Sequence, residues 1–132
     1  SLANKVPNIE PIDLTVNPFQ NFAGSFQVAE NVWMLPAYGH SRGHSIVVAY
    51  ETDTTASCAH SDGFYYVFAG DLTASREALK NGQYLPLTVS KALSQESLDN
   101  VREFVKNNRT VYLLNHAQNL EDLITEKSFV EL

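Results

Sequence analysis

The chain has 132 residues, of which 44% are hydrophobic, so it is long enough to bury a sizeable core as one globular domain. Its 9 Lys and Arg against 15 Asp and Glu give a formal net charge of -6, and the basic residues are scattered, which disfavours nucleic-acid binding. No apolar stretch approaches bilayer length, and the single cysteine, Cys58, cannot form an internal disulfide, so we expect a cytoplasmic protein with no membrane contact.

The first half of the chain reads as a lead-in followed by strands. Residues 1–24 hold three prolines and are predicted to be irregular, with at most one short strand. Two strands over 26–29 and 32–37 follow, and Glu30-Asn31 is the turn between them. A strand over 45–52 comes next. Its almost continuous apolar and β-branched residues predict burial on both of its faces.

The second half alternates helices and strands. After a polar loop that ends at Asp62-Gly63, we predict strands over 64–69 and 110–114. A short helix is expected over 75–81, and a last one runs from Asn119, as its N-terminal cap, to Glu126. The longest helix is predicted over 89–108, because apolar residues recur there at three- and four-residue steps. That stripe consists of Leu93, Leu98, Val101, Phe104 and Val105.

Polar side chains gather where three of these strands end. The segment Gly39-His40-Ser41-Arg42-Gly43-His44 joins two predicted strands, Asp71 follows the strand over 64–69, and His116 follows the strand over 110–114. Side chains at the ends of neighbouring strands can converge on one point. Imidazole nitrogens and a carboxylate are suitable ligands for zinc, iron or manganese. Each residue alone is more often a turn or core residue, so only the joint placement indicates a metal site.

These motifs resemble the later metal-site motifs of the metallo-β-lactamase fold. The segment around His40, the strand end Phe68-Ala69-Gly70-Asp71 and the strand end Leu113-Leu114-Asn115-His116 follow one another in the order and approximate spacing of that superfamily. The resemblance covers roughly residues 26 to 126 and is greatest to the N-acyl homoserine lactonase-like hydrolases. It implies an α/β (α+β) fold: half of an αββα sandwich, with a mostly antiparallel or mixed sheet and helices on one face.

The resemblance also implies roles for single residues. His40 would bind the first of two divalent metal ions, Asp71 would bridge both ions, and His116 would bind the second; zinc is the first expectation, with iron or manganese as alternatives. His44 would support the site without binding a metal, and His60 matches no motif. Lactonases of this group tend to carry a tyrosine three residues after the bridging aspartate, where this chain has Ala74, so the resemblance does not specify a lactone substrate.

One signature of the superfamily is absent. Nothing in the chain resembles His-X-His-X-Asp-His, which supplies four ligands in the family. We therefore expect residues 25–132 to be the carboxyl-terminal half of a binuclear hydrolase of lactones, esters, thioesters or β-lactams, with a small-molecule substrate and no activity in this chain alone. No catalytic side chain other than the metal ligands is predicted.

Two alternatives remain open at this stage. The chain can be a non-catalytic binding or self-association module built on the half-fold, in which a homodimer covers the exposed sheet. It can also be an unrelated α+β protein, in which case the three strand ends need not bring His40, Asp71 and His116 together.

Overall fold

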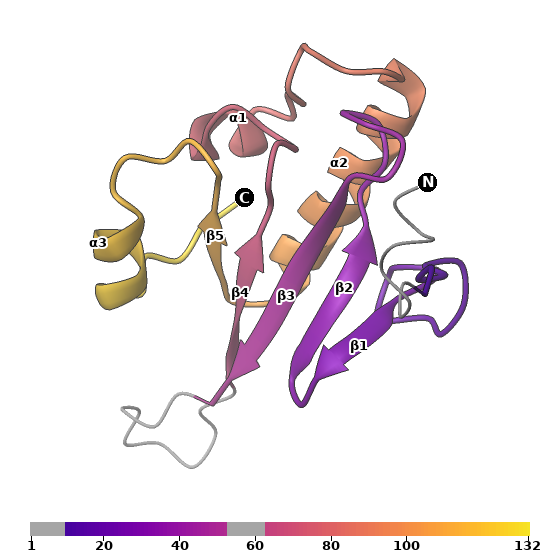
Figure 1. Cartoon of the computed structure of the whole chain (residues 1–132). Helices are drawn as coiled ribbons and strands as arrows, with labels where there is room; N and C mark the ends of the chain where they lie inside the picture. The colour runs from indigo at the N-terminus through magenta and orange to yellow at the C-terminus, as the bar shows by residue number, and fades with distance from the viewer. Residues whose placement is uncertain (1–9, 53–62) are drawn as a thin grey trace, which may run out of the picture.

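The computed structural model describes residues 10–52 and 63–132. In these residues five strands form one sheet in the order β1-β2-β3-β4-β5 (Figure 1). The strands are β1 (Phe26–Ala29), β2 (Val32–Pro36), β3 (Ser45–Glu51), β4 (Phe64–Phe68) and β5 (Thr110–Leu113). Strands β1 to β4 pair antiparallel, and β5 pairs parallel with β4. The mixed sheet of an α+β fold is thus confirmed.

The helices of the described residues lie on both faces of the sheet, so the expectation that they all lie on one face is wrong. A parallel pair of strands needs a long crossover, and between β4 and β5 the chain passes through α1 (Arg76–Lys80) and α2 (Lys91–Asn107), which cover one face (Figure 1). Helix α3 (Leu120–Thr125) follows β5, and its Leu123 packs with Val111 and Leu113 on the opposite face. No helix in the described part of the chain is long and apolar enough to cross a membrane.

The element boundaries agree with the sequence analysis to within one or two residues. The lead-in contains one isolated bridge, between Phe19 and Phe22, and Asn31 in the first turn adopts a positive φ of 61°. The side chain of Asn119, predicted to cap α3, makes no capping hydrogen bond. At that position only the backbone is used, since the Asn119 carbonyl accepts from Leu123 N–H.

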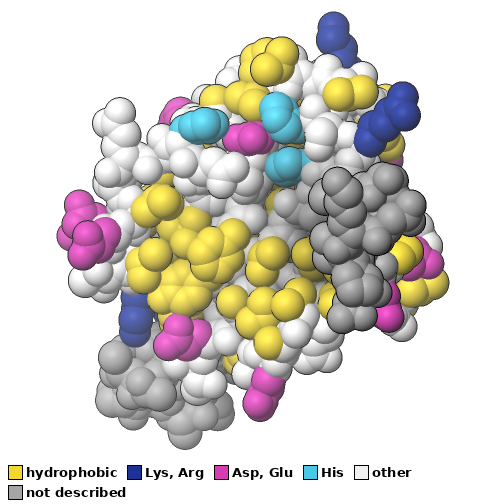
Figure 2. Space-filling model, viewed as in Figure 1, with side chains coloured by type: hydrophobic (Ala, Val, Ile, Leu, Met, Phe, Trp, Pro, Cys, Tyr) yellow, Lys and Arg dark blue, Asp and Glu magenta, His cyan; other side chains and the backbone are white. Residues whose placement is uncertain are grey.

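The face opposite α2 is largely open and carries a row of apolar side chains. Phe26, Met34, Val47, Phe68 and Leu113 pair in register across all five strands, so their side chains line up on one face. Helix α3 covers the end of this row at β5 and leaves the rest uncovered, with Phe26 41% and Phe68 46% exposed (Figure 2). We call the uncovered part, Phe26, Met34, Val47 and Phe68, the open face.

The predicted burial of β3 on both faces is wrong for this chain. Ile46 and Val48 are buried beneath α2, whereas Val47 and Ala49 on the other face are only half-buried. Strand β3 is central in the sheet, and its composition is that of a strand covered on both sides. The described residues provide the cover on one side only.

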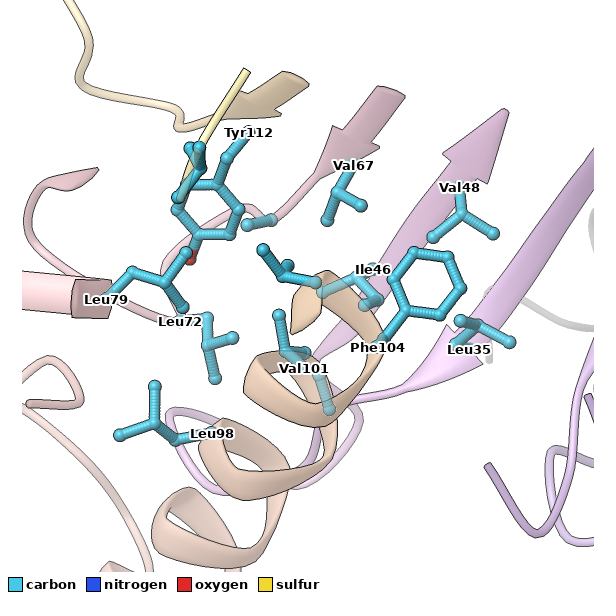
Figure 3. Close-up of a cluster of buried hydrophobic side chains, with 14 of the residues drawn as sticks. Leu35, Ile46, Val48, Val67, Leu72, Leu79, Leu98, Val101, Phe104 and Tyr112 are labelled. Carbon is cyan, nitrogen blue, oxygen red and sulfur yellow. The ribbon is translucent and has the colours of Figure 1, made fainter. Parts of the chain in front are cut away.

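The hydrophobic core lies between α2 and the sheet (Figure 3). Helix α2 begins at Ser90, whose side-chain oxygen accepts a hydrogen bond from Leu93 N–H at 3.2 Å and satisfies one of the free amides of the first turn. The buried side chains that meet in this core include Leu35, Ile46, Val48, Val67, Leu72, Leu79, Leu98, Val101, Phe104 and Tyr112.

The first turns of α2 differ from the predicted apolar stripe. Leu93 is 42% exposed, and Ser94 and Ser97 are buried in its place. The reason is a close backbone approach: a Cβ atom on Gly39, which has φ +138°, would lie 2.3 Å from Ser94 Oγ. Ser97 Oγ also donates a hydrogen bond to the Tyr38 carbonyl at 2.7 Å. Small polar residues therefore fasten α2 to the loop that follows β2.

A buried polar pair ties β5 to the loop that follows Asp71. Thr73 Oγ1 donates to the Ser75 carbonyl at 3.0 Å and lies 2.9 Å from the hydroxyl of Tyr112, which is fully buried. Burial raises the pKa of Tyr112 above its ordinary value, so the phenol stays neutral. Its hydroxyl can then donate to Thr73 Oγ1 and hold this loop against β5.

Candidate metal centre

Three predicted ligands meet at one edge of the sheet. Strands β2, β4 and β5 run in the same direction, so the residues that follow them gather at the same edge. His40 Nε2 lies 3.5 Å from Asp71 Oδ2, and His116 Nε2 lies 3.2 Å from Asp71 Oδ1. Figure 2 shows histidine side chains around an acidic one at the upper edge, directly above the hydrophobic side chains of the open face.

The imidazole of His40 is oriented by the backbone of a distant loop. Its Nδ1 lies 2.6 Å from the Leu87 carbonyl, an acceptor, so Nδ1 carries the proton and donates. In the neutral ring, Nε2 then presents a lone pair toward Asp71 Oδ2, which is also an acceptor. Two acceptors that face each other at 3.5 Å repel unless a proton or a metal cation lies between them.

The carboxylate of Asp71 is the centre of this cluster. Its Oδ1 atom is buried and has no hydrogen-bond partner among the described residues, although His116 Nε2 is 3.2 Å away. Each oxygen thus faces a different histidine. Two ligands of a tetrahedral zinc ion, each at about 2.1 Å, lie about 3.4 Å apart, which is close to both measured separations. The arrangement suits a carboxylate that bridges two cations.

His44 lies within the cluster and has a different function. Its Nε2 accepts a hydrogen bond from the backbone N–H of Asp71 at 3.0 Å, and its Nδ1 lies 2.9 Å from the Ala37 carbonyl. An Nε2 that accepts from an amide carries no proton, so Nδ1 donates to Ala37. Because both ring nitrogens are occupied, His44 cannot bind a metal without losing a hydrogen bond.

Arg42 and Ala74 make none of the contacts that define the cluster. His60 falls outside the described residues, as does Cys58. Arg42 and Ala74 are exposed. The acceptor to which His40 is anchored, the Leu87 carbonyl, was not predicted. A backbone carbonyl belongs to every residue type, so no sequence pattern could have identified it.

The donor set fits one side of a two-metal centre and is incomplete. In the described residues no group of three or more His, Cys, Asp and Glu side chains can hold a single metal ion. Each ion would have two protein ligands, one histidine and one Asp71 oxygen, whereas a catalytic zinc ion normally has three. His40 and Asp71 are about three-quarters buried, but the His116 side chain is 78% exposed.

The hollow beside the cluster is also small. A cavity of about 180 Å³, lined by residues that include Phe68, Gly70 and Asn115, adjoins Asp71. Small-molecule sites usually occupy about 300–1,000 Å³. A larger hollow of about 750 Å³ lies at the opposite edge of the sheet, around Arg109 and Phe129, away from the three ligands. A third hollow, of about 660 Å³, is lined by residues that include Ala74 and Pro86, in the segment between Asp71 and α2, and by none of the three ligands.

Solved structures share this arrangement of strands and helices. The chain matches an N-acyl homoserine lactone hydrolase with its product N-hexanoyl-L-homoserine bound at the catalytic metal centre, at 19% identity and a TM-score of 0.55, over 75% of this chain and 36% of that one. A Bacillus thuringiensis AiiA mutant with N-decanoyl-L-homoserine bound at the active site matches with the same values.

A third match is a probable metal-dependent hydrolase from Staphylococcus aureus, at 17% identity and a TM-score of 0.53, over 70% of this chain and 30% of that one. The chain has part of a metallo-β-lactamase-like fold. It spans about a third of the length of these matching structures. No sequence-family model and no curated protein sequence matches it.

The structure meets two expectations that the resemblance raised. The long helix α2 lies between Asp71 and His116 in sequence, as the resemblance implies, and the strand ends do bring the three residues together. An unrelated α+β fold is thereby excluded, because the structural likeness extends over most of the chain.

Proposed function

We propose that this chain is the carboxyl-terminal metal-binding part of a binuclear metal-dependent hydrolase that cleaves a lactone, ester, thioester or β-lactam. The observation that carries the proposal is Asp71, whose two oxygens each face one histidine at the carboxyl ends of parallel strands. Structural likeness to metal-dependent lactone hydrolases supports the same class of reaction. The substrate would be a small molecule, and zinc is the metal we propose.

The chain's own residues would hold the metals and fix their spacing. His40 and Asp71 Oδ2 would bind one ion, and His116 and Asp71 Oδ1 the other. Two bound divalent ions supply Lewis-acid polarisation of a carbonyl and a water that loses its proton near neutral pH. The Leu87 carbonyl keeps His40 in the tautomer that leaves Nε2 available, as outer partners of metal-bound histidines commonly do.

Completion of the site requires further protein. Two ligands for each ion are too few for a catalytic zinc site, so these 132 residues alone should be inactive. The open face adjoins the cluster, and a second sheet packed on it would lie beside both ions. We propose that such a layer supplies the remaining ligands and the substrate pocket, and that the enzyme is cytoplasmic.

Calorimetric titration of the chain with Zn²⁺ tests this proposal. We expect two weakly bound zinc ions per chain and no hydrolysis of an N-acyl homoserine lactone. His40→Ala and His116→Ala should each remove one of the two ions, because each histidine faces a different oxygen of Asp71. Gln118→Ala, an exposed change two residues beyond His116, should retain both. Failure of the wild-type chain to bind Zn²⁺ would contradict the metal site, and turnover by the chain alone would contradict its incompleteness.

A second candidate is a non-catalytic module that self-associates through the open face. The observation in its favour is the exposure of Phe26 (41%) and Phe68 (46%) on an apolar row that crosses the sheet. In this case a second copy of the chain would cover the face. Sedimentation velocity distinguishes the two: a stable dimer that binds no zinc favours the module, whereas a monomer that binds zinc favours the hydrolase part.

A further inference from the structure

We propose that His44 positions Asp71 through its backbone, so that metal affinity depends on a histidine that does not bind metal. His44 Nε2 accepts from Asp71 N–H at 3.0 Å and is the only described side chain that bonds to that amide. Because Asp71 lies in a loop after β4, its carboxylate is only as well placed as its backbone. The proposal concerns the same centre and therefore rests on the proposed function.

The geometry of His44 joins two strand ends. Its Nδ1 donates to the carbonyl of Ala37, which follows β2, and its Nε2 accepts from Asp71, which follows β4. Strand β3 lies between these two strands in the sheet, and His44 immediately precedes its first residue. One planar ring thus sets the distance between the segment that carries His40 and the segment that carries Asp71.

Gly70 makes this contact possible. It has a left-handed φ of +56°, and a Cβ atom at this position would lie 2.8 Å from His44 Nε2. Any residue other than glycine would therefore be strained and would also push the imidazole away from the Asp71 amide. Gly70 and His44 are therefore required together.

The two hydrogen bonds of His44 can be separated by substitution. In His44→Gln the amide oxygen lies at the same position along the side chain as Nε2, so it can accept from Asp71 N–H. In His44→Asn the amide nitrogen lies at the position of Nδ1, so it can donate to Ala37 but does not reach Asp71. His44→Leu removes both bonds. Thr110→Val is the matched control, because it removes a side-chain hydrogen bond of a buried residue, to the Asn108 carbonyl, at the opposite edge of the sheet.

The test measures Zn²⁺ affinity by calorimetry, amide hydrogen exchange at Asp71, and thermal unfolding for each variant of the full chain. We expect His44→Leu and His44→Asn to weaken Zn²⁺ binding about 10–100-fold, the usual effect of losing an outer partner of a metal site. Exchange at the Asp71 amide should become faster in both. His44→Gln should recover most of the affinity and the protection, and Thr110→Val should change neither.

The outcomes separate this proposal from the proposed function. Equal Zn²⁺ affinity in the wild-type, His44→Asn and His44→Gln chains would overturn the positioning role even if His44→Leu failed to fold. A merely structural role predicts that His44→Asn and His44→Gln differ only in thermal stability. If the wild-type chain bound no Zn²⁺, the proposed function would fail, and the role of His44 in metal affinity would fail with it. In that case, slow exchange of the Asp71 amide in His44→Gln and fast exchange in His44→Asn would show only that His44 accepts a hydrogen bond from this amide.

Discussion

Asp71→Asn is expected to reduce Zn²⁺ binding by the chain at least about 100-fold, because it changes the one residue that faces both histidines. Loss of an outer partner of a metal site costs about 10–100-fold, and Asp71 would touch both ions directly. The amide removes the negative charge and places an NH₂ group opposite His40 or His116, where a cation would have to bind. Both zinc ions should be lost together, in contrast to the single losses expected for each histidine.

The fold of this variant should be unaffected. The backbone N–H of Asp71 still donates to His44, and the side chain is partly exposed, so the free energy of unfolding should change by less than about 0.5 kcal/mol. Asp122→Asn, an exposed carboxylate on α3, is the matched control and should retain both ions. Zinc calorimetry beside urea unfolding decides the matter. Retention of even one ion at wild-type affinity in Asp71→Asn would show that Asp71 is not the bridging ligand.

The cluster around Asp71 was accessible from sequence because its members follow strands. Chemistry-bearing residues that end parallel strands must meet at one edge, so the positions of His40, Asp71 and His116 in the pattern were sufficient to bring them together. The tautomers were not accessible. They depend on the Leu87 and Ala37 carbonyls, which no residue-type pattern marks and which only the folded loops bring near the rings.

Two predictions of burial were wrong, for Leu93 and for Val47. Leu93 fits the apolar period of α2, yet it is exposed because the first turns of the helix face the chain at Tyr38 and Gly39. Periodicity reports which side chains share a face of the helix and not what that face meets. Val47 was predicted to be buried because it is apolar, and composition alone does not show whether any layer packs on its face of the sheet; in the described residues it is half-buried.

The incomplete ligand set and the open face point to the same missing layer. One histidine and one Asp71 oxygen give each ion two ligands, and the described residues provide no third. The open face ends at β4, directly beside Asp71. A protein surface that packed on Val47 and Phe68 would exclude water from the same edge at which metal ligands are lacking. Metal binding and association of that layer should therefore stabilise each other, since each places groups that the other needs.

Phe104→Ala is expected to have the largest effect on stability of any single core change, about 3–5 kcal/mol. Phe104 is 1% exposed, and its ring lies 5.0 Å from Tyr65 and 6.2 Å from both Phe19 and Phe22, measured between ring centroids. The substitution removes the side chain that joins α2, β4 and the lead-in. A domain of this size is stable by only about 5–15 kcal/mol, so much of the total would be lost.

The matched control lies on the same helix. Leu93→Ala removes an apolar side chain that is 42% exposed, and it should cost less than about 1 kcal/mol, although the sequence pattern assigns Leu93 and Phe104 to one stripe. Urea unfolding of the two variants checks the difference, and equal losses would show that the core is not centred on Phe104. Because the ring contacts of Phe104 are with Phe19, Phe22 and Tyr65 and not with His40, Asp71 or His116, Zn²⁺ affinity in Phe104→Ala should fall only in proportion to the unfolded fraction.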